Sequence, residues 1–324
     1  MHLATVEAFQ AFQGEALPGN ALIVHADKGW HDHILLGKCD FFEKLGQAAK
    51  ARGIATLLVR ADSPGAPSPL EGPQKRIMVG PRRFQGPNIF HAFPAYIKGF
   101  WYLDPMGYFW NSSMMMMPFD PASIDFDEAA AFFGRISRWR IRNNVSQRKQ
   151  APATSLPAAD VAIFTQDIER YTDNVHYLST RQMIRAAAGA VQGRCYVKPH
   201  PLMTDEQRTW LGKLCGRLPN ATIVDASVHD IIRASNVIVS QNSAVGFEAL
   251  MHHKPVITCA RTDYATASLV SQTASEMRDR IKRATLHFAD FPYEKYFYWF
   301  LGLNMLEPQN DAFTARAMRI LYCS

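Results

Sequence analysis

The order of apolar and polar positions predicts alternating strands and helices in the first half of the chain. Residues 21–25 form a short apolar run that ends in His25, which is typical of a buried strand. Apolar residues then recur at helical spacing over 40–52, with Gly53 as the stop, and 54–59 is a second apolar run. This order predicts a βαβ unit of a parallel sheet. Further elements are expected as a proline-rich loop at 62–73, strands at 77–79 and 88–91, and a helix at 124–143.

The same rhythm restarts after a change of composition between residues 150 and 160. That stretch is dominated by alanine and proline, so it predicts a domain boundary. Two α/β, Rossmann-like halves joined there would face a cleft, with ligands at the carboxyl ends of the strands. In the second half, strands are expected at 161–165, 194–198, 221–224, 237–240 and 255–258, and helices at 175–191, 204–218, 228–234 and 244–252.

The final stretch is dense in aromatic side chains between residues 291 and 306. Such a stretch is typical of helices that pack across both domains, and a role at a membrane interface is the alternative. We therefore predict three parts, namely two Rossmann-like domains at 1–150 and 151–290 and a helical tail at 291–324 that crosses back over them.

Composition excludes several classes of protein. Of the 324 residues, 48% are hydrophobic and 20% are charged, which is enough for a core and excludes wholesale disorder. No apolar run approaches the roughly 20 residues that span a bilayer, and residues 1–13 lack the apolar stretch of a signal peptide. The expected location is therefore cytoplasmic. The five cysteines contain no CxxC pair, which argues against a disulfide framework or a zinc site and favours buried thiols.

The net charge of +6 is spread along the chain, and its densest part lies between Arg135 and Lys149. This part favours either an anionic substrate, an acidic membrane surface or an ordinary solvated helix face. Within it, residues 146–150 either contact an anionic acceptor or are solvated. No signature of a nucleic-acid-binding module accompanies these residues, so nucleic acid is excluded as a partner.

The first motif with chemical content is Lys-Pro-His-Pro at residues 198–201, directly after a predicted strand. The two prolines restrict the backbone on either side of His200, which presents the imidazole rigidly where ligands bind. Such a histidine can donate a hydrogen bond to a phosphate oxygen, and Lys198 adds positive charge. Pro201 completes the motif, and the alternative is a proline-rich turn with an incidental histidine.

The second motif runs from Ser240 to Leu250, where small polar residues follow a strand and a helix begins at once. Asn242 or Ser243 would cap that helix and leave backbone N–H groups for an anion. Glu248 lies one turn inside and could reach a ribose diol, or it simply complements the helix dipole. Together the two motifs predict a nucleoside mono- or diphosphate ligand.

These paired motifs resemble the C-terminal half of bacterial capsule polysaccharide biosynthesis proteins of the KpsC/KpsS type, over residues 161–257. Those proteins are GT-B glycosyltransferases related to retaining β-Kdo transferases that use CMP-Kdo. The resemblance implies that His200 and the segment Ser240–Ser243 hold the CMP phosphate and that Glu248 positions the nucleotide. Gln166 is similar to a recurrent glutamine after the first strand of this half. The resemblance also makes 151–290 the nucleotide-sugar domain and 1–150 the acceptor and catalytic domain.

Asp104 is the acid that the resemblance points to in the first half. It follows an aromatic strand and precedes a Pro-x-Gly turn, where the resembled transferases carry a Glu-Asp-Gly segment. This chain reads Leu-Asp-Pro, so one acid of the pair is missing. Asp104 is expected to act as nucleophile or base at the anomeric carbon. Stabilising the turn before Pro105 is the equally supported alternative.

Weaker substrate-binding candidates surround these positions. His25, Asp27 and His31 follow the first predicted strand and are interpreted as contacts for an acidic sugar or acceptor. Their spacing lacks the pattern of a helical metal-binding pair, so no metal is expected. Ser112 and Ser113 are the remaining candidates.

The resulting prediction is a glycosyltransferase that transfers Kdo from CMP-Kdo to a glycan or glycolipid acceptor in capsule or surface polysaccharide biosynthesis. The donor nucleotide sugar is the ligand, no further cofactor is expected, and peripheral association with the inner membrane is left open. Two alternatives remain. One is a CDP-glycerol-type phosphotransferase on the same scaffold, and the other is a non-catalytic capsule assembly or export factor.

Overall fold

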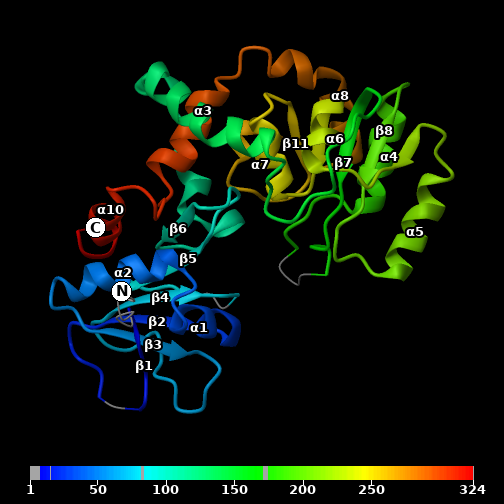
Figure 1. Ribbon diagram of the computed structural model, residues 1–324. Helices are drawn as coiled ribbons and strands as arrows, with labels where there is room; N and C mark the ends of the chain where they lie inside the picture. Colours follow the sequence, from blue (N-terminus) through cyan, green and yellow to red (C-terminus); the bar gives the residue numbers. More distant parts are fainter. Residues whose placement is uncertain (1–7, 15, 82–83, 171–173, 324) are drawn as a thin grey trace. The chain divides into compact units, whose positions relative to one another are not determined.

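The computed structural model describes residues 8–14, 16–81, 84–170 and 174–323. Its contacts divide the chain into two compact units (Figure 1). The first unit takes the chain up to Ala95, Gly99–Ser113 and the chain from Leu301 onward. The second unit takes Tyr96–Lys98 and Met114–Phe300. Each unit is built around one mainly parallel sheet, which confirms the α/β fold class.

The first unit holds a six-stranded sheet in the order β1-β3-β2-β4-β5-β6. Neighbouring strands are parallel except β5 and β6, which pair antiparallel with His91 opposite Asp104. The strand β2 is buried at every position, as expected for a parallel strand covered on both faces. The strands are β1 (Gln10–Ala11), β2 (Leu22–Ala26), β3 (Thr56–Arg60), β4 (Lys75–Val79), β5 (Ile89–Pro94) and β6 (Trp101–Asp104).

Helices α1 (Lys28–Leu35), α2 (Asp40–Lys50) and α10 (Phe313–Tyr322) cover this sheet. Helix α10 lies beside α2, and the Phe313 ring meets Phe41 edge-on at 5.4 Å (Figure 1). The expected helix at 40–52 and the flanking strands are confirmed. Helix α1 was not expected, because His25, Asp27 and His31 were considered only as substrate contacts and not as part of a helix.

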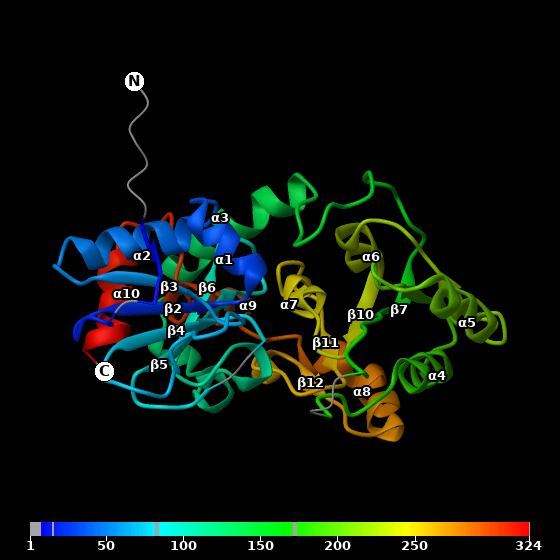
Figure 2. The same ribbon diagram turned by 90° about the horizontal axis from the view of Figure 1, so that it is seen from below.

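The second unit holds a six-stranded, fully parallel sheet in the order β12-β11-β10-β7-β8-β9. Helices α4, α5 and α8 pack on one face, and α6 and α7 lie on the other (Figure 2). The strands are β7 (Ala159–Phe164), β8 (Cys195–Lys198), β9 (Ala221–Ile223), β10 (Ser235–Ser240), β11 (Val256–Thr258) and β12 (Leu269–Val270).

One helix of the second unit, α4, starts later than the expected range 175–191. Helix α4 begins only at Thr180, where Ser179 and Gln182 form a reciprocal capping box, so 175–179 is not helical. The helices are α3 (Phe126–Arg142), α4 (Thr180–Ala190), α5 (Asp205–Cys215), α6 (Val228–Ala234), α7 (Ala244–Leu250), α8 (Ala274–His287) and α9 (Tyr293–Phe297).

The two units divide the chain at other places than the predicted ranges 1–150, 151–290 and 291–324. Helix α3 belongs to the second unit because Phe133 packs edge-on against Phe297 of α9 at 5.2 Å. The expected linker is bound to the same unit, since Thr154 N–H donates to Asp230 at 2.8 Å. The aromatic tail is shared, with α9 in the second unit and α10 in the first.

The composition predicted buried, unpaired cysteine thiols and no membrane-spanning helix. Cys39, Cys195, Cys215 and Cys259 are buried free thiols, and Cys323 is an exposed one. Within the described ranges, no helix has both the length and the apolar character required to cross a membrane.

Candidate functional site

A cavity of about 420 Å³ lies in the second unit, at the carboxyl ends of β7 and β8. Ligands in parallel α/β sheets bind at this edge, and the volume falls within the usual range of about 300–1,000 Å³ for ligand pockets. Three segments supply most of its lining. They are Thr165 with Lys198–Pro201, Ser243–Val245 with Glu248, and residues 146–151.

His200 is held in one orientation by its neighbours. Its backbone N–H donates to Thr165 Oγ1 at 2.8 Å, and its Nδ1 accepts from the Leu202 N–H at 3.3 Å. Burial and, secondarily, the nearby Arg148 charge lower the pKa of His200. The imidazole is therefore neutral at pH 7, and because Nδ1 accepts, Nε2 carries the proton. His200 can thus donate a hydrogen bond from Nε2 to an anionic ligand.

Positive charge dominates the remaining ionic groups of the cavity. Lys198, Arg148, Lys149 and Arg208 line it, against Asp225 and the buried Glu248. Lys198 Nζ lies 3.0 Å from a carboxylate oxygen of Asp225, whose side chain is 86% exposed. An ion pair with so exposed a partner is weak, so Lys198 remains available to a phosphate oxygen.

Glu248 forms the most unusual part of the cavity. Its side chain is only 2% exposed, and burial raises its pKa to about 7. Oε1 accepts from Ser146 Oγ at 2.8 Å, and the Gln147 backbone N–H also donates to the carboxylate. Among the described residues, Oε2 has no hydrogen-bond partner. Glu248 therefore offers a buried, unsatisfied oxygen next to the cavity, and such an atom is costly without a ligand or water.

Ser243 caps the short helix α7 through the Val245 N–H at 3.2 Å. The Tyr264 hydroxyl donates to the Ser243 carbonyl at 2.8 Å, which fixes the turn that precedes the helix. Ser243 is the member of the predicted Ser240–Ser243 segment that lines the cavity.

Three predicted nucleotide-binding residues, namely Gln166, Ser240 and Asn242, do not line the cavity. Gln166 Oε1 accepts from the Asn242 backbone N–H at 2.8 Å, and Asn242 Nδ2 donates to the Arg261 carbonyl at 2.9 Å. Ser240 is fully buried at the end of β10. The Gln166 and Asn242 side chains thus hold the turn between β10 and α7.

Residues 146–150 are brought to this cavity although they precede the predicted domain boundary. Sequence reasoning considered them only as acceptor contacts or a solvated segment. Their basic character was visible in the sequence, but their place in the lining of this cavity depends on bonds to residues far along the chain.

Asp104 lies at the end of β6 and is 6% exposed. Its Oδ1 accepts from the Met106 and Gly107 N–H groups at 2.7 and 3.0 Å. Its Oδ2 accepts from the N–H and hydroxyl of Ser113 at 2.9 and 2.5 Å. Four hydrogen bonds thus commit the carboxylate to the turn, as the turn-stabilising alternative requires.

The other first-unit candidates also make local contacts. His25 is buried with Nε2 3.1 Å from Arg76 Nη1, and burial with this charge lowers its pKa to about 4. Asp27 caps α1 through the Trp30 N–H, and His31 lies 3.4 Å from Asp32. The Ser112 hydroxyl donates to the Phe109 carbonyl.

His25 and Asp27 line a cavity of only about 80 Å³. Within the described ranges, no group of three or more metal-ligating side chains occurs.

The two sheets with their connecting helices define a two-unit α/β fold of the GT-B class. The same fold occurs in the β-Kdo 2,7 transferase KpsC of Thermosulfurimonas dismutans, with 13% identity over 81% of this chain and 89% of that chain, at a TM-score of 0.50. The KpsC β-Kdo 2,4 transferase of the same organism matches at 13% identity over 83% and 91% of the two chains, with a TM-score of 0.49. The UDP-GlcNAc 2-epimerase of Neisseria meningitidis matches at 11% over 94% and 100%, with a TM-score of 0.39.

Residues 172–295 match the family model of capsule polysaccharide biosynthesis proteins. This part of the chain contains Lys198, His200, Ser243 and Glu248, so the resemblance drawn from the paired motifs is confirmed there. No curated protein matches the chain.

Proposed function

We propose that this protein is a glycosyltransferase of capsule or surface polysaccharide biosynthesis that binds a CMP-activated sugar, Kdo, in the cavity of the second unit. The observation that carries the proposal is the placement of His200 and Lys198 at the carboxyl end of β8, inside the segment that matches the capsule family model. The fold shared with a β-Kdo 2,7 transferase supports the choice of donor.

Each group of the cavity has a role in this proposal. His200 Nε2–H and Lys198 bind the phosphate, and their fixed positions stabilise the negative charge that develops as CMP leaves. Glu248 Oε2 binds a ribose hydroxyl, which satisfies the oxygen left without a partner. Gln166 and Asn242 act indirectly by holding the turn that presents Ser243. The acceptor is a glycan or glycolipid, whose hydroxyl attacks the anomeric carbon.

A thermal-shift panel with CMP, CDP, UDP, GDP and NAD tests the proposal. Ligand at about 100 times its Kd stabilises by about 2.7 kcal/mol, enough to raise Tm by several degrees. We expect selective stabilisation by CMP that His200→Ala removes and that His287→Ala, an exposed histidine outside the cavity, retains. A preference for CDP would redirect the proposal to the CDP-glycerol type, and no shift with any nucleotide would contradict it.

One observation favours a second candidate, a non-catalytic capsule assembly or export factor. The Asp104 carboxylate is engaged by the turn at Met106 and Gly107 and by Ser113, so the acid expected at the anomeric carbon is committed elsewhere. Sugar release from CMP-Kdo, measured with and without acceptor glycan, separates the two candidates. CMP binding without any turnover would favour the assembly factor.

Peripheral membrane association is part of the proposal and is supported by helix α3. Arg135, Arg138 and Trp139 are exposed at spacings of three and four residues, so they lie on one face of the helix. An exposed tryptophan among arginines fits an anionic lipid surface. Co-sedimentation with anionic but not zwitterionic vesicles, reduced in Trp139→Ala, is the expected result. If Trp139→Ala binds anionic vesicles as well as the unaltered protein does, this face of α3 is not the membrane-binding surface.

A further inference from the structure

Residues 144–151 form a closed loop, here called the cationic loop, that carries Arg148 and Lys149. Asn144 Nδ2 donates to the Ala151 carbonyl at 2.8 Å and so joins the two ends of the loop. Asn144 has a φ of 54°, a left-handed conformation that asparagine adopts more readily than most residues. The loop therefore has a built-in closure independent of its surroundings.

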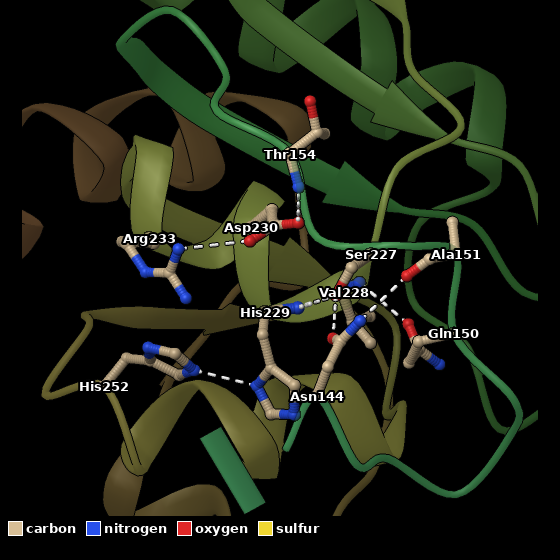
Figure 3. Close-up of polar contacts among 10 residues, drawn as sticks. All are labelled: Asn144, Gln150, Ala151, Thr154, Ser227, Val228, His229, Asp230, Arg233 and His252. Carbon is tan, nitrogen blue, oxygen red and sulfur yellow. Dashed lines mark hydrogen bonds and ion pairs between the residues drawn. The ribbon is translucent and has the colours of Figure 1, made fainter. Parts of the chain in front are cut away.

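The N-terminal end of helix α6 holds both ends of this loop (Figure 3). The Ser227 hydroxyl donates to Asn144 Oδ1, and the Val228 N–H donates to Gln150 Oε1 at 2.9 Å. His229 Nε2–H donates to the Val145 carbonyl at 3.0 Å.

The buried His229 also contacts the half-buried His252 (Figure 3). A carbonyl only accepts, so Nε2 of His229 carries the proton and its Nδ1 accepts from His252 Nε2–H at 2.9 Å. Burial lowers the pKa of both imidazoles, that of His252 to about 3, so the pair is neutral at pH 7. The hydrogen bond from His229 to the Val145 carbonyl therefore does not change with protonation across physiological pH.

The middle of the loop is held as well. Ser146 Oγ donates to Glu248, and Gln147 Nε2 donates to the Tyr96 carbonyl at 2.7 Å. The adjacent Arg148 and Lys149 are exposed and line the cavity. A preorganised loop places two cations against a ligand at little entropic cost.

This loop supplies more positive charge than one phosphate requires. The wall at the end of β8 already offers His200 and Lys198 to a phosphate. Arg148 approaches that wall closely enough for its charge to affect His200. Arginine differs from lysine in its planar fork, which binds a carboxylate through two parallel hydrogen bonds.

We propose that the cationic loop is a subsite for a carboxylate on the sugar of the donor, and that Arg148 determines specificity for a sugar acid. This inference rests on the proposed function, because it assumes that a CMP-sugar occupies the cavity. Lys149 adds to the local field, while Asn144 and His229 are positioning residues that hold the loop. Glu248 also holds it, by accepting from Ser146 through Oε1, in addition to its proposed ribose contact through Oε2.

Calorimetric titration of the full chain with CMP and with CMP-Kdo, without acceptor, tests the proposal. The two ligands share the nucleotide and differ by the sugar acid. We expect Arg148→Gln to weaken CMP-Kdo binding about ten-fold or more while changing CMP binding little. Arg217→Gln, which removes an exposed arginine outside the cavity, should bind both ligands as the unaltered protein does.

The Asn144→Gly variant tests the positioning role separately. Glycine tolerates the left-handed backbone, so this change removes the side-chain bonds to Ala151 and Ser227 without backbone strain. We expect a smaller loss of CMP-Kdo affinity than for Arg148→Gln, with CMP affinity retained.

The possible results separate the two proposals. If neither ligand binds the unaltered protein, the proposed function fails. If both bind and Arg148→Gln weakens them equally, Arg148 is a phosphate contact and the carboxylate subsite is refuted, while the proposed function stands. Unchanged binding of both ligands by Arg148→Gln also refutes the subsite.

Discussion

Replacing Glu248 by glutamine should change how the stability of the protein depends on pH. The carboxyl is 2% exposed, and burial raises its pKa from 4.5 to about 7. A raised folded-state pKa means that the folded protein binds the proton more tightly than the unfolded chain. The stability that this group contributes is therefore fully present below about pH 4.5 and is lost as pH rises through about 7.

The size of the effect follows from the shift between the two values. Each pKa unit corresponds to about 1.4 kcal/mol, so the loss of stability from acid to alkaline pH amounts to about 3 kcal/mol. Glutamine does not titrate, and its Oε1 can still accept from Ser146 and from the Gln147 N–H. Relative to the unaltered protein, Glu248→Gln should therefore gain about 3 kcal/mol, most of it between pH 5 and pH 8.

Urea unfolding at pH 5, 6, 7 and 8 measures this difference, with both proteins followed by circular dichroism. Glu206→Gln is the matched control, because Glu206 is an exposed carboxyl in the first turn of α5. The free energy of unfolding of Glu206→Gln should change with pH in the same way as that of the unaltered protein. If that of Glu248→Gln also changes in this way, the carboxyl is solvated in solution and the argument from its burial is refuted.

Three further substitutions test separate parts of the structure. Asp104→Asn replaces the oxygen that accepts from the Ser113 N–H by an amide that donates, so the free energy of unfolding in urea should fall by about 1–3 kcal/mol. Lost sugar transfer at unchanged stability would instead favour a role of Asp104 in catalysis. Gly246→Ala places a Cβ 2.7 Å from the Tyr264 hydroxyl. We expect a loss of about 1–3 kcal/mol in stability, seen as a Tm lower by several degrees. An unchanged Tm would mean that the Tyr264 ring moves freely. Phe313→Ala leaves a cavity at a buried position and should lower the free energy of unfolding by about 3–5 kcal/mol. A decrease below about 1 kcal/mol would show that α10 is not part of the first unit's core.

The sheets could be predicted because their strands are short and mostly apolar. Residues 21–25 and 161–165 are such runs, and they correspond to the buried strands β2 and β7. Helix α6 was expected at its observed bounds, 228–234, and in the structure the Ser227 side chain caps it. These signals are local, so one sequence is enough to detect them.

Features that depend on distant contacts could not be predicted. The aromatic run of β6 gives no sign of its antiparallel direction. Helix α3 follows a pattern that fits either unit, and its packing against residues such as Phe297 and His253 assigns it to the second. The site shows the same limit. Lys198 and Glu248 were found through their places after strands, whereas Arg148 reaches the cavity through bonds with α6 and α7.

The division of the chain into discontinuous units has a consequence for its synthesis. The sheet of the first unit is complete once β6 has been made, but α2 keeps an apolar face that Phe313 and α10 later cover. Roughly 200 residues separate these events, or about 10–40 s of translation at ordinary speeds. During that time the nascent first unit exposes Phe41 and its neighbours while the whole second unit is being made. We therefore expect a chaperone that shields apolar surface to bind the nascent chain in the interval between the synthesis of α2 and that of α10.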